Sequence, residues 1–262
     1  MKLKRLVLTG AAGRLGSYLR EPLSQLCDEL VSSDMVESLG PLYAGERYQR
    51  ADLADKAAIH ALLAGADMVV HFGAISDEAT FEDILGPNII GAYNVWEAAH
   101  QQGLRRVVYA SSIHAVGMYP KAEFIGTDVP HRPDTFYGLA KCFAEDLGRM
   151  YWDKRGLESV HLRILSCAQV TSPRALGTWL SYDDLIRLVT RAIDTPTTGF
   201  SVVYGVSNND RAPVDNAKAS HLGYRPQDNA EAFAAQILAE APRPDPSDLA
   251  QSCHGGAFAS VG

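Results

Sequence analysis

Short apolar runs alternate along the chain with longer stretches in which apolar residues recur every three or four positions. Such runs are typical of buried strands, and such stretches are typical of helices with one apolar face. The expected strands span residues 5–9, 30–33, 68–72, 106–110, 160–164 and 201–206, with a shorter run near residues 48–49. The expected helices span residues 15–26, 56–63, 89–102, 137–156, 182–194 and 229–240.

This alternation predicts an α/β fold, a doubly wound parallel sheet of the Rossmann type joined by right-handed crossovers. Residues 1–166 are expected to form the nucleotide-binding part, with the sheet completed by the later strand near residues 201–206. Residues 167–262 are expected to form a small C-terminal substrate-binding portion and tail, in one compact unit with the first part. The proline-rich residues 242–246 precede a glycine-rich tail, which could dock on the body, dock on a neighbouring subunit or be mobile.

A glycine-rich turn, T-G-A-A-G-R-L-G, connects the first expected strand to the first expected helix. Gly10 permits a tight turn, Gly13 lets the backbone approach a pyrophosphate, and Gly16 lets the helix pack on the strand. Arg14 and Leu15 open the helix, whose first N–H groups and dipole favour an anion. The alternative is a plain strand–turn–helix connection. The sequence pattern clearly predicts both the strand before the turn and the helix after it, and this favours a nucleotide-binding turn.

Asp34 follows the second expected strand, eighteen residues after Gly16. An acidic side chain at this place accepts hydrogen bonds from ribose hydroxyls and repels a 2′-phosphate, which favours NAD over NADP. An ordinary surface aspartate is the alternative. Ligands of such sheets bind beyond the carboxyl ends of the strands. Further candidate cofactor contacts therefore follow the later strands: Asp52 and Leu53 at the adenine, Gly73 and Ala74 beside the cofactor, and Ile164 at the nicotinamide end.

The composition excludes several classes of partner. The 262 residues are 47% hydrophobic, carry a net charge of −7 and show no basic stripe, which argues against nucleic acid and anionic membranes. The apolar run after the basic N-terminus is too short for a signal peptide, and no stretch approaches the ~20 apolar residues of a membrane span. A cytoplasmic protein is expected. The four scattered cysteines form no metal-binding pattern, so we expect no metal and no disulfide framework.

Tyr137 and Lys141 stand four residues apart at the start of the long helix after Pro133, so they share one helix face. An ordinary tyrosine has a pKa of ~10, but a lysine ammonium and an oxidised nicotinamide nearby would favour the phenolate. Ser111 and Ser112 follow the strand at residues 106–110, and Ser112 is the candidate for binding the reacting hydroxyl. A packing tyrosine beside a snorkelling lysine, and serines that only cap the backbone, are the alternatives.

Together these features resemble the short-chain dehydrogenase/reductase superfamily in its extended form, with the spacing G-x-x-G-x-x-G. The resemblance also includes Gly-Pro-Asn-Ile-Ile-Gly around Asn88 and Leu-Gly-Tyr-Arg-Pro at residues 222–226. It implies a catalytic triad of Ser112, Tyr137 and Lys141, with Lys141 also holding the nicotinamide ribose. It further implies that Asn88 supports a water relay to Lys141, unless Asn88 only caps its helix. A homo-oligomer formed through helices 89–102 and 137–156 is expected on the same basis.

Several loops are similar to those of the bacterial uronate dehydrogenases, namely residues 71–76, 151–154, 177–184, 228–233 and 255–258. This resemblance implies oxidation of D-glucuronate or D-galacturonate at C1 with NAD, giving an aldarolactone that opens to the aldaric acid. Relatives read Ser-Ser-Asn-His where this chain has Ile113 in place of the asparagine. The loop at residues 168–173 also differs from theirs and is one residue shorter. Both departures bear on the choice between the two uronates.

A uronate needs a cation for its C6 carboxylate, and the arginine fork is the preferred partner. The resemblance assigns this role to Arg174, while Arg163 lies within a strand and could face a structural partner. A solvated surface arginine is the alternative for Arg174. Ser76, His114 and Ser166 match positions that bind sugar hydroxyls or the carboxylate, although His114 could instead be a structural histidine.

Two other functions use the same features. A nucleotide-sugar epimerase or dehydratase employs the same trio, but it commonly carries a longer C-terminal part and retains NAD through turnover. The second alternative is a catalytically silent NAD-sensing binding protein, although such members usually lose the tyrosine or lysine and this chain keeps both. Net NADH formation with free uronates distinguishes the first reading from both alternatives.

Overall fold

The structure is a computed structural model that describes residues 2–239, 241 and 245–261. Its centre is a seven-stranded sheet in the order β3-β2-β1-β4-β5-β6-β7. All six strand pairs are parallel. The strands are β1 (Leu3–Thr9), β2 (Cys27–Ser33), β3 (Glu46–Tyr48), β4 (Met68–His71), β5 (Arg106–Tyr109), β6 (Glu158–Ile164) and β7 (Phe200–Gly205). The predicted doubly wound parallel sheet is confirmed, and three strands begin two or three residues earlier than predicted.

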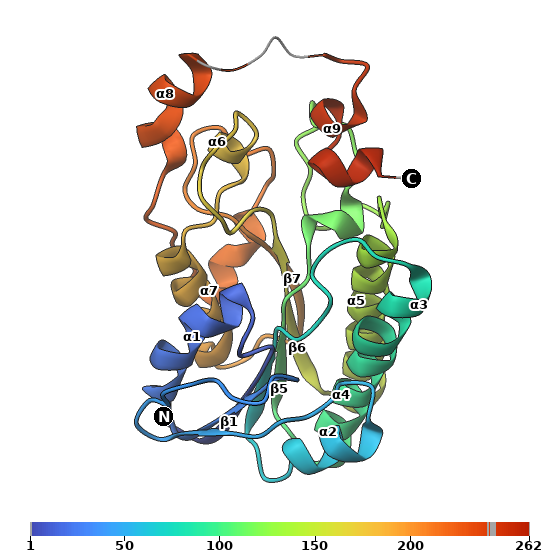
Figure 1. Cartoon of the computed structure of the whole chain (residues 1–262), viewed down its shortest axis with the longest axis vertical. Helices are drawn as coiled ribbons and strands as arrows, with labels where there is room; N and C mark the ends of the chain where they lie inside the picture. The colour runs from blue at the N-terminus through green and yellow to red at the C-terminus, as the bar shows by residue number, and fades with distance from the viewer. Residues whose placement is uncertain (1, 240, 242–244, 262) are drawn as a thin grey trace.

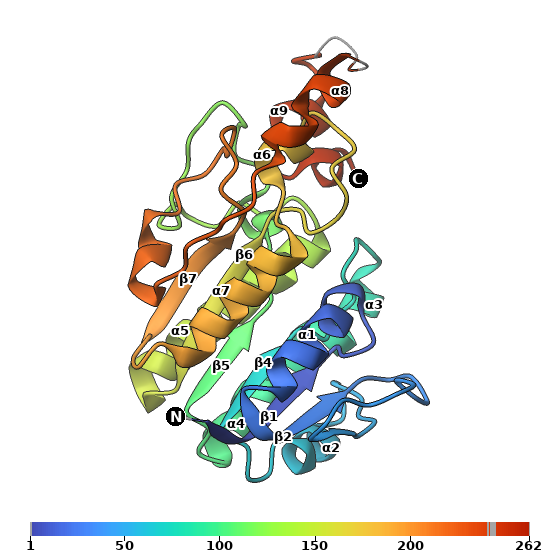
Figure 2. The same ribbon diagram turned by 90° about the vertical axis from the view of Figure 1, so that its left-hand side faces the viewer.

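Helices cover both faces of the sheet (Figures 1 and 2). On one face lie α1 (Arg14–Ser24) and α7 (Tyr182–Asp194), and on the other lie α2 (Lys56–Leu62), α4 (Gly91–Gln101) and α5 (Phe136–Arg155). Side chains of a strand point alternately to the two faces, so β1 sends Leu6 and Leu8 into one core and Val7 into the other. Because both faces are covered, every residue of β4 and β5 is buried, and both strands contain consecutive apolar residues.

The helix predicted at residues 89–102 begins earlier and in a different form. A short helix α3 (Phe81–Ile84) continues into a π-helical segment η1 (Leu85–Ile90) and then into α4. Pro87 lies in the π-helical segment and has no N–H to give to an α-helical bond. The sequence pattern detected only the apolar face of α4 and missed the irregular turn before it.

Short elements cluster at the end of the sheet where the strands finish (Figure 1). They are η2 (Ile113–Val116), α6 (Ala175–Thr178), η4 (Ala230–Phe233), α8 (Ala234–Ala239), α9 (Leu249–Ser252) and η5 (Gly256–Ser260). The 3-10 segment η3 (Ala217–Leu222) lies instead beside the start of β7, where His221 contacts Ser201. The helix predicted at 229–240 is therefore a 3-10 turn followed by α8. Residues 240 and 242–244, which hold the predicted helix end and part of the proline-rich segment, lie outside the described residues.

The C-terminal tail docks on the body of the same chain. The N–H of His254 donates to the carbonyl of Tyr119 at 2.9 Å, and that of Gly255 donates to the carbonyl of Gly117 at 2.8 Å. These bonds bring the last described residues back over the loop that precedes α5. Among the described helices, none combines the length and the apolar character that crossing a membrane requires.

Candidate active site

A cavity of about 1070 Å³ lies at the carboxyl ends of the strands. Its wall contains residues from both halves of the sheet, as expected where the strand order reverses between β1 and β4. Twelve of the predicted cofactor contacts line it: Gly10, Gly13, Arg14, Leu15, Gly16, Asp34, Asp52, Leu53, Gly73, Ala74, Lys141 and Ile164. The fold thus gathers side chains that the sequence separates by more than 150 residues into one cavity.

The glycine turn has the shape that a pyrophosphate cradle requires. Gly10 has a φ of 74°, and a Cβ there would lie 2.5 Å from the carbonyl carbon of Phe72. A Cβ at Gly16 would lie 2.0 Å from the Gly10 oxygen, so helix and strand pack only with glycine. Gly13, the N-cap of α1, makes no side-chain cap, and a Cβ there would meet only the Gly10 oxygen at 3.2 Å. The N-terminal end of α1 therefore faces the cavity, where it fits a phosphate anion.

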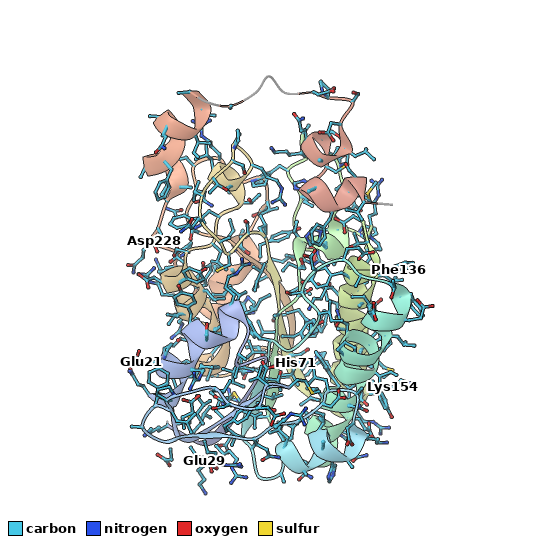
Figure 3. The ribbon with its side chains drawn as sticks, viewed as in Figure 1. Glu21, Glu29, His71, Phe136, Lys154 and Asp228 are labelled. Atoms are coloured by element: carbon cyan, nitrogen blue, oxygen red, sulfur yellow. The ribbon has the colours of Figure 1, made fainter. Side chains whose placement is uncertain are left out.

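Asp34 is held beside this turn. Its carboxylate accepts hydrogen bonds from the N–H of Ala12 at 2.9 Å and from the N–H of Met35 at 2.7 Å. The negative charge thus stands at the end of β2, next to the glycine turn, where it fits ribose hydroxyls and repels a 2′-phosphate. Beneath the turn, His71 Nδ1 lies 2.7 Å from Thr9 Oγ1, and burial lowers the pKa of His71 to about 3 (Figure 3).

The predicted trio meets on the opposite wall. Tyr137 and Lys141 lie in the first turns of α5, and Ser112 follows β5. All three side chains line the cavity and are buried. Lys141 Nζ donates to the carbonyl of Ala110 at 2.8 Å and lies 5.1 Å from the centre of the Tyr137 ring. The geometry therefore places a phenol, a hydroxyl and an amine around one point of the cavity.

Burial shifts the pKa values of both Tyr137 and Lys141. Burial raises the pKa of Tyr137 to about 12, although a hydrogen bond with Ser112 lowers it, and burial lowers the pKa of Lys141 to about 7. Removal of water disfavours the charged form of each group. The prediction that the lysine ammonium and an oxidised nicotinamide together favour the phenolate concerns the complex with the cofactor, and it stays a prediction. The chain alone keeps the phenol protonated at neutral pH.

A buried ionic network lies one helical turn behind Lys141. Glu145 accepts two hydrogen bonds from Arg163, at 3.0 and 2.7 Å, and one from the hydroxyl of Ser111 at 2.5 Å. Although burial raises it, the pKa of Glu145 stays well below its usual range because His131 and Arg163 bond to it. Arg163 therefore has a structural partner, as anticipated, and Ser111 is occupied. Both serines line the cavity, but the Ser111 hydroxyl is bonded to Glu145, so Ser112 remains the candidate for the reacting hydroxyl.

Three of the four predicted substrate residues besides the trio also line the cavity: Ser76, His114 and Ser166. Arg174 does not line it. Its Nη2 donates to the carbonyl of His254 at 2.7 Å, and burial lowers its pKa although Asp134 opposes this. In the described part of the chain Arg174 makes no ion pair. It is a half-buried cation held by the docked tail, and its role toward a carboxylate stays a prediction.

The structure shows what Asn88 and Ile113 contact, which the sequence left open. The Asn88 amide accepts the N–H of Ile75 and donates to the carbonyl of Ile75, both at 2.9 Å, and it does not line the cavity. It neither caps a helix nor contacts Lys141 directly, and the water relay stays a prediction. Ile113 is fully buried in an apolar cluster with Leu165 and Tyr204, so it offers the cavity no polar group.

Sequence reasoning missed three residues of the site. Phe258 from the docked tail lines the cavity, and Asp134 and Glu78 hold residues that line it. Asp134 precedes the N-cap of a predicted helix, which was an available signal for a polar role. Phe258 and Glu78 had no local signal, because their roles depend on loops that meet only in the folded chain.

Comparisons with known proteins identify relatives of this chain. Residues 6–176 match the NAD dependent epimerase/dehydratase family. The chain is 47% identical to a uronate dehydrogenase of Pseudomonas putida, covering 98% of this chain and 96% of that protein. It is 46% identical to one of Agrobacterium fabrum, covering 98% and 97%. A dTDP-glucose 4,6-dehydratase of Mycolicibacterium smegmatis is 28% identical, covering 79% of this chain and 63% of that protein.

Solved structures give the same relationship. A mutant uronate dehydrogenase from Agrobacterium tumefaciens complexed with NAD superposes with a TM-score of 0.94 at 45% identity, covering 99% of this chain and 98% of that chain. A glucuronic acid dehydrogenase from Chromohalobacter salexigens gives 0.96 at 45% identity, with the same coverage. The chain therefore belongs to the NAD dependent epimerase/dehydratase family and, within it, to the uronate dehydrogenases.

Proposed function

We propose that this chain oxidises hexuronic acids, D-glucuronate and D-galacturonate, at C1 with NAD and releases an aldarolactone that opens to the aldaric acid. The observation that carries the proposal is the cavity itself. One wall presents the glycine turn and Asp34, and the other presents Ser112, Tyr137 and Lys141. Arg174 stands beyond the cavity lining as the cation for the C6 carboxylate.

When bound, NAD supplies the acceptor for the hydride that leaves C1, together with a positive ring beside the phenol. Tyr137 takes the proton of the C1 hydroxyl, and Ser112 holds that hydroxyl in place. Lys141 stays close to the tyrosine and to the Ala110 carbonyl that orients it. Because the unaided phenol has a pKa of about 12, the positive charge brought by the cofactor is the added factor that favours the phenolate.

The test is Tyr137→Phe, assayed as NADH formation from glucuronate and galacturonate. We expect turnover to be nearly abolished while NAD binding, measured by calorimetry, is retained. Tyr151→Phe is the matched control, since Tyr151 lies on the same helix and bonds to Glu97 instead of facing the cavity. Full activity of Tyr137→Phe would remove the tyrosine from the mechanism, and a wild-type protein without net NADH formation would overturn the proposed function.

We also infer a homo-oligomer formed through α4, α5 and the segment before α4. Apolar side chains are exposed along this side of the molecule, and Phe136 lies at its outer edge (Figure 3). The exposed residues are Phe81, Ile90, Tyr93, Phe136, Leu139, Phe143 and Met150. Such a patch marks an interface when it is continuous. Light scattering should show an assembly for the wild type and a monomer for Leu139→Glu/Phe143→Glu; a monomeric wild type contradicts the inference.

The same proposal assigns NAD binding and sugar binding to different parts of the chain. Residues 1–166 bind NAD, and residues 167–262 contribute Arg174 and Phe258 to the sugar end, within one unit. The cytoplasmic location remains a prediction, which fractionation of the source cells checks.

A further inference from the structure

Asp134 carries a buried carboxylate beside the active-site cavity that the mechanism above does not use. Its side chain is fully buried, in the residue before the N-cap of α5. Oδ2 lies 2.7 Å from Nδ1 of His114, and Oδ1 accepts the hydroxyl of Thr135 at 2.9 Å. No lysine or arginine of the described residues forms an ion pair with it. A buried carboxylate is costly unless it is hydrogen-bonded, so His114 is its principal partner.

Three glycines pack closely around the Asp134 carboxylate and fix its position. A Cβ at Gly117 or at Gly255 would lie 1.9 Å from Oδ2, and one at Gly138 would lie 3.0 Å from Oδ1. The three glycines come from the loop after η2, the docked tail and the start of α5. The position of the Asp134 carboxylate is therefore set by three separate segments of the chain.

The imidazole of His114 is held on its remaining sides as well. The ring of Phe258 stacks on it with centroids 4.1 Å apart and planes 20° apart, and the Tyr137 ring meets it edge-on at 5.7 Å. Its backbone N–H donates to Ser112 Oγ at 3.3 Å. The side chain keeps 13% of its surface exposed, and His114 lines the cavity. Only Nε2 is left without a protein partner among the described residues.

We propose that Asp134 is a positioning residue that acts through His114. Its carboxylate accepts only, so it holds the proton of neutral His114 on Nδ1 and leaves Nε2 as an acceptor for a sugar hydroxyl. This assignment rests on the proposed function and deepens it. An acceptor nitrogen backed by a buried negative charge attracts a hydroxyl and repels a carboxylate. The C6 carboxylate of the uronate therefore binds at Arg174, and Nε2 of His114 accepts a hydrogen bond from a ring hydroxyl beside the reacting carbon.

The first test is a double-mutant cycle on KM for glucuronate, with Asp134→Leu, His114→Ala and the double variant. Asp134→Leu should raise KM about tenfold, as expected for one lost hydrogen bond in a desolvated site, with the Kd of NAD unchanged. In the His114→Ala background the same change should raise KM less than about twofold, since its partner is gone. Asp134→Asn keeps an acceptor oxygen and should recover most of the affinity. An equal loss in both backgrounds would show that Asp134 does not act through His114.

The second test needs neither a variant at position 134 nor activity. Nitrogen-15 spectra of the wild-type protein at about pH 9 report which ring nitrogen of a neutral histidine carries the proton. His114→Ala identifies the signals of His114 among those of the eight histidines. We expect the Nδ1–H tautomer; the Nε2–H tautomer would overturn the proposal even if the protein folds and turns over uronates. A wild type without uronate turnover would instead overturn the proposed function and leave the tautomer result readable.

Discussion

The carboxylate of Glu78 accepts a hydrogen bond from the backbone N–H of Tyr137 at 2.9 Å. Its other oxygen accepts the N–H of Phe136 at 3.0 Å. These are two of the N–H groups that a helix start leaves without intrahelical partners. The negative charge of Glu78 also interacts favourably with the dipole of α5. Glu78 belongs to the loop that carries Ser76, and Asn88 holds Ile75 of that loop. The loop and the tyrosine helix are therefore tied together at the mouth of the sugar site.

Replacing Glu78 by alanine should lower both stability and catalysis. We expect a loss of about 1 kcal/mol of unfolding free energy, because two helix-terminal N–H groups lose their acceptor. We also expect kcat/KM to fall roughly tenfold to a hundredfold, because Tyr137 and Ser76 lose their common anchor. Asp55→Ala is the control: it removes a carboxylate that accepts two N–H groups at the start of α2, away from the site. Equal kinetic losses in the two variants would show that the link to Tyr137 has no role.

Replacing Arg174 by alanine should raise KM for glucuronate by roughly a hundredfold, since truncating one partner of a buried charged pair costs about 2–5 kcal/mol. Arg174 also holds the tail through His254, so the acid is compared with its neutral amide, glucuronamide. The amide should bind weakly to the wild type and be little affected by the substitution. Arg211→Ala, which removes a surface pair with Glu231, is the control. Equal losses for acid and amide would assign Arg174 a structural role only.

Replacing Lys141 by methionine should stabilise the protein while abolishing turnover. Burial lowers the pKa of Lys141 from 10.5 to about 7, so between these pH values the unfolded chain binds one more proton than the folded chain. The stability contributed by this group therefore rises with pH, by about 1.4 kcal/mol per pH unit. The advantage of methionine should be largest below about pH 7 and shrink toward about pH 10.

Urea unfolding of both proteins without cofactor, at about pH 6.5 and about pH 9.5, measures this difference. Other titrating groups, including His131, are present in both proteins, so their contributions cancel in the difference between the two unfolding free energies. A difference that stays constant with pH would show that Lys141 keeps an ordinary pKa in the folded chain.

Replacing Gly117 by alanine should displace Asp134. The added Cβ would lie 1.9 Å from the carboxylate oxygen, and overpacking of this kind costs about 1–3 kcal/mol. We expect KM for the uronate to rise together with the loss of stability, since the contact between Asp134 and His114 is disturbed. Gly126→Ala is the control, because a Cβ there meets no atom within 4 Å. An unchanged KM in a destabilised Gly117→Ala variant would separate the glycine from the site.

Much of the fold and of the candidate site was predicted from local sequence patterns. The strand and helix periods identified the sheet, because residues 2 or 3.6 positions apart share a face in these elements. The glycine turn, Asp34, Ser112, Tyr137 and Lys141 were found because each follows a strand or opens a helix. The π-helical turn around Asn88 was missed, because its cause is an interruption of a helix and its bond to Ile75 joins separate segments. The rise of the Tyr137 pKa in the chain without cofactor was not foreseen, because burial is not visible in a motif.

The sequence by itself determined the family and the α/β fold, and it predicted the nucleotide cradle and the trio, since these depend on residues close together in the chain and on its regular alternation. The tertiary structure alone decided that Phe258 of the tail lines the cavity and that Asp134 faces His114. It also decided that water is removed from Tyr137 and Lys141 alike. Those properties arise from contacts between distant segments and from exclusion of solvent, and both exist only once the chain has folded.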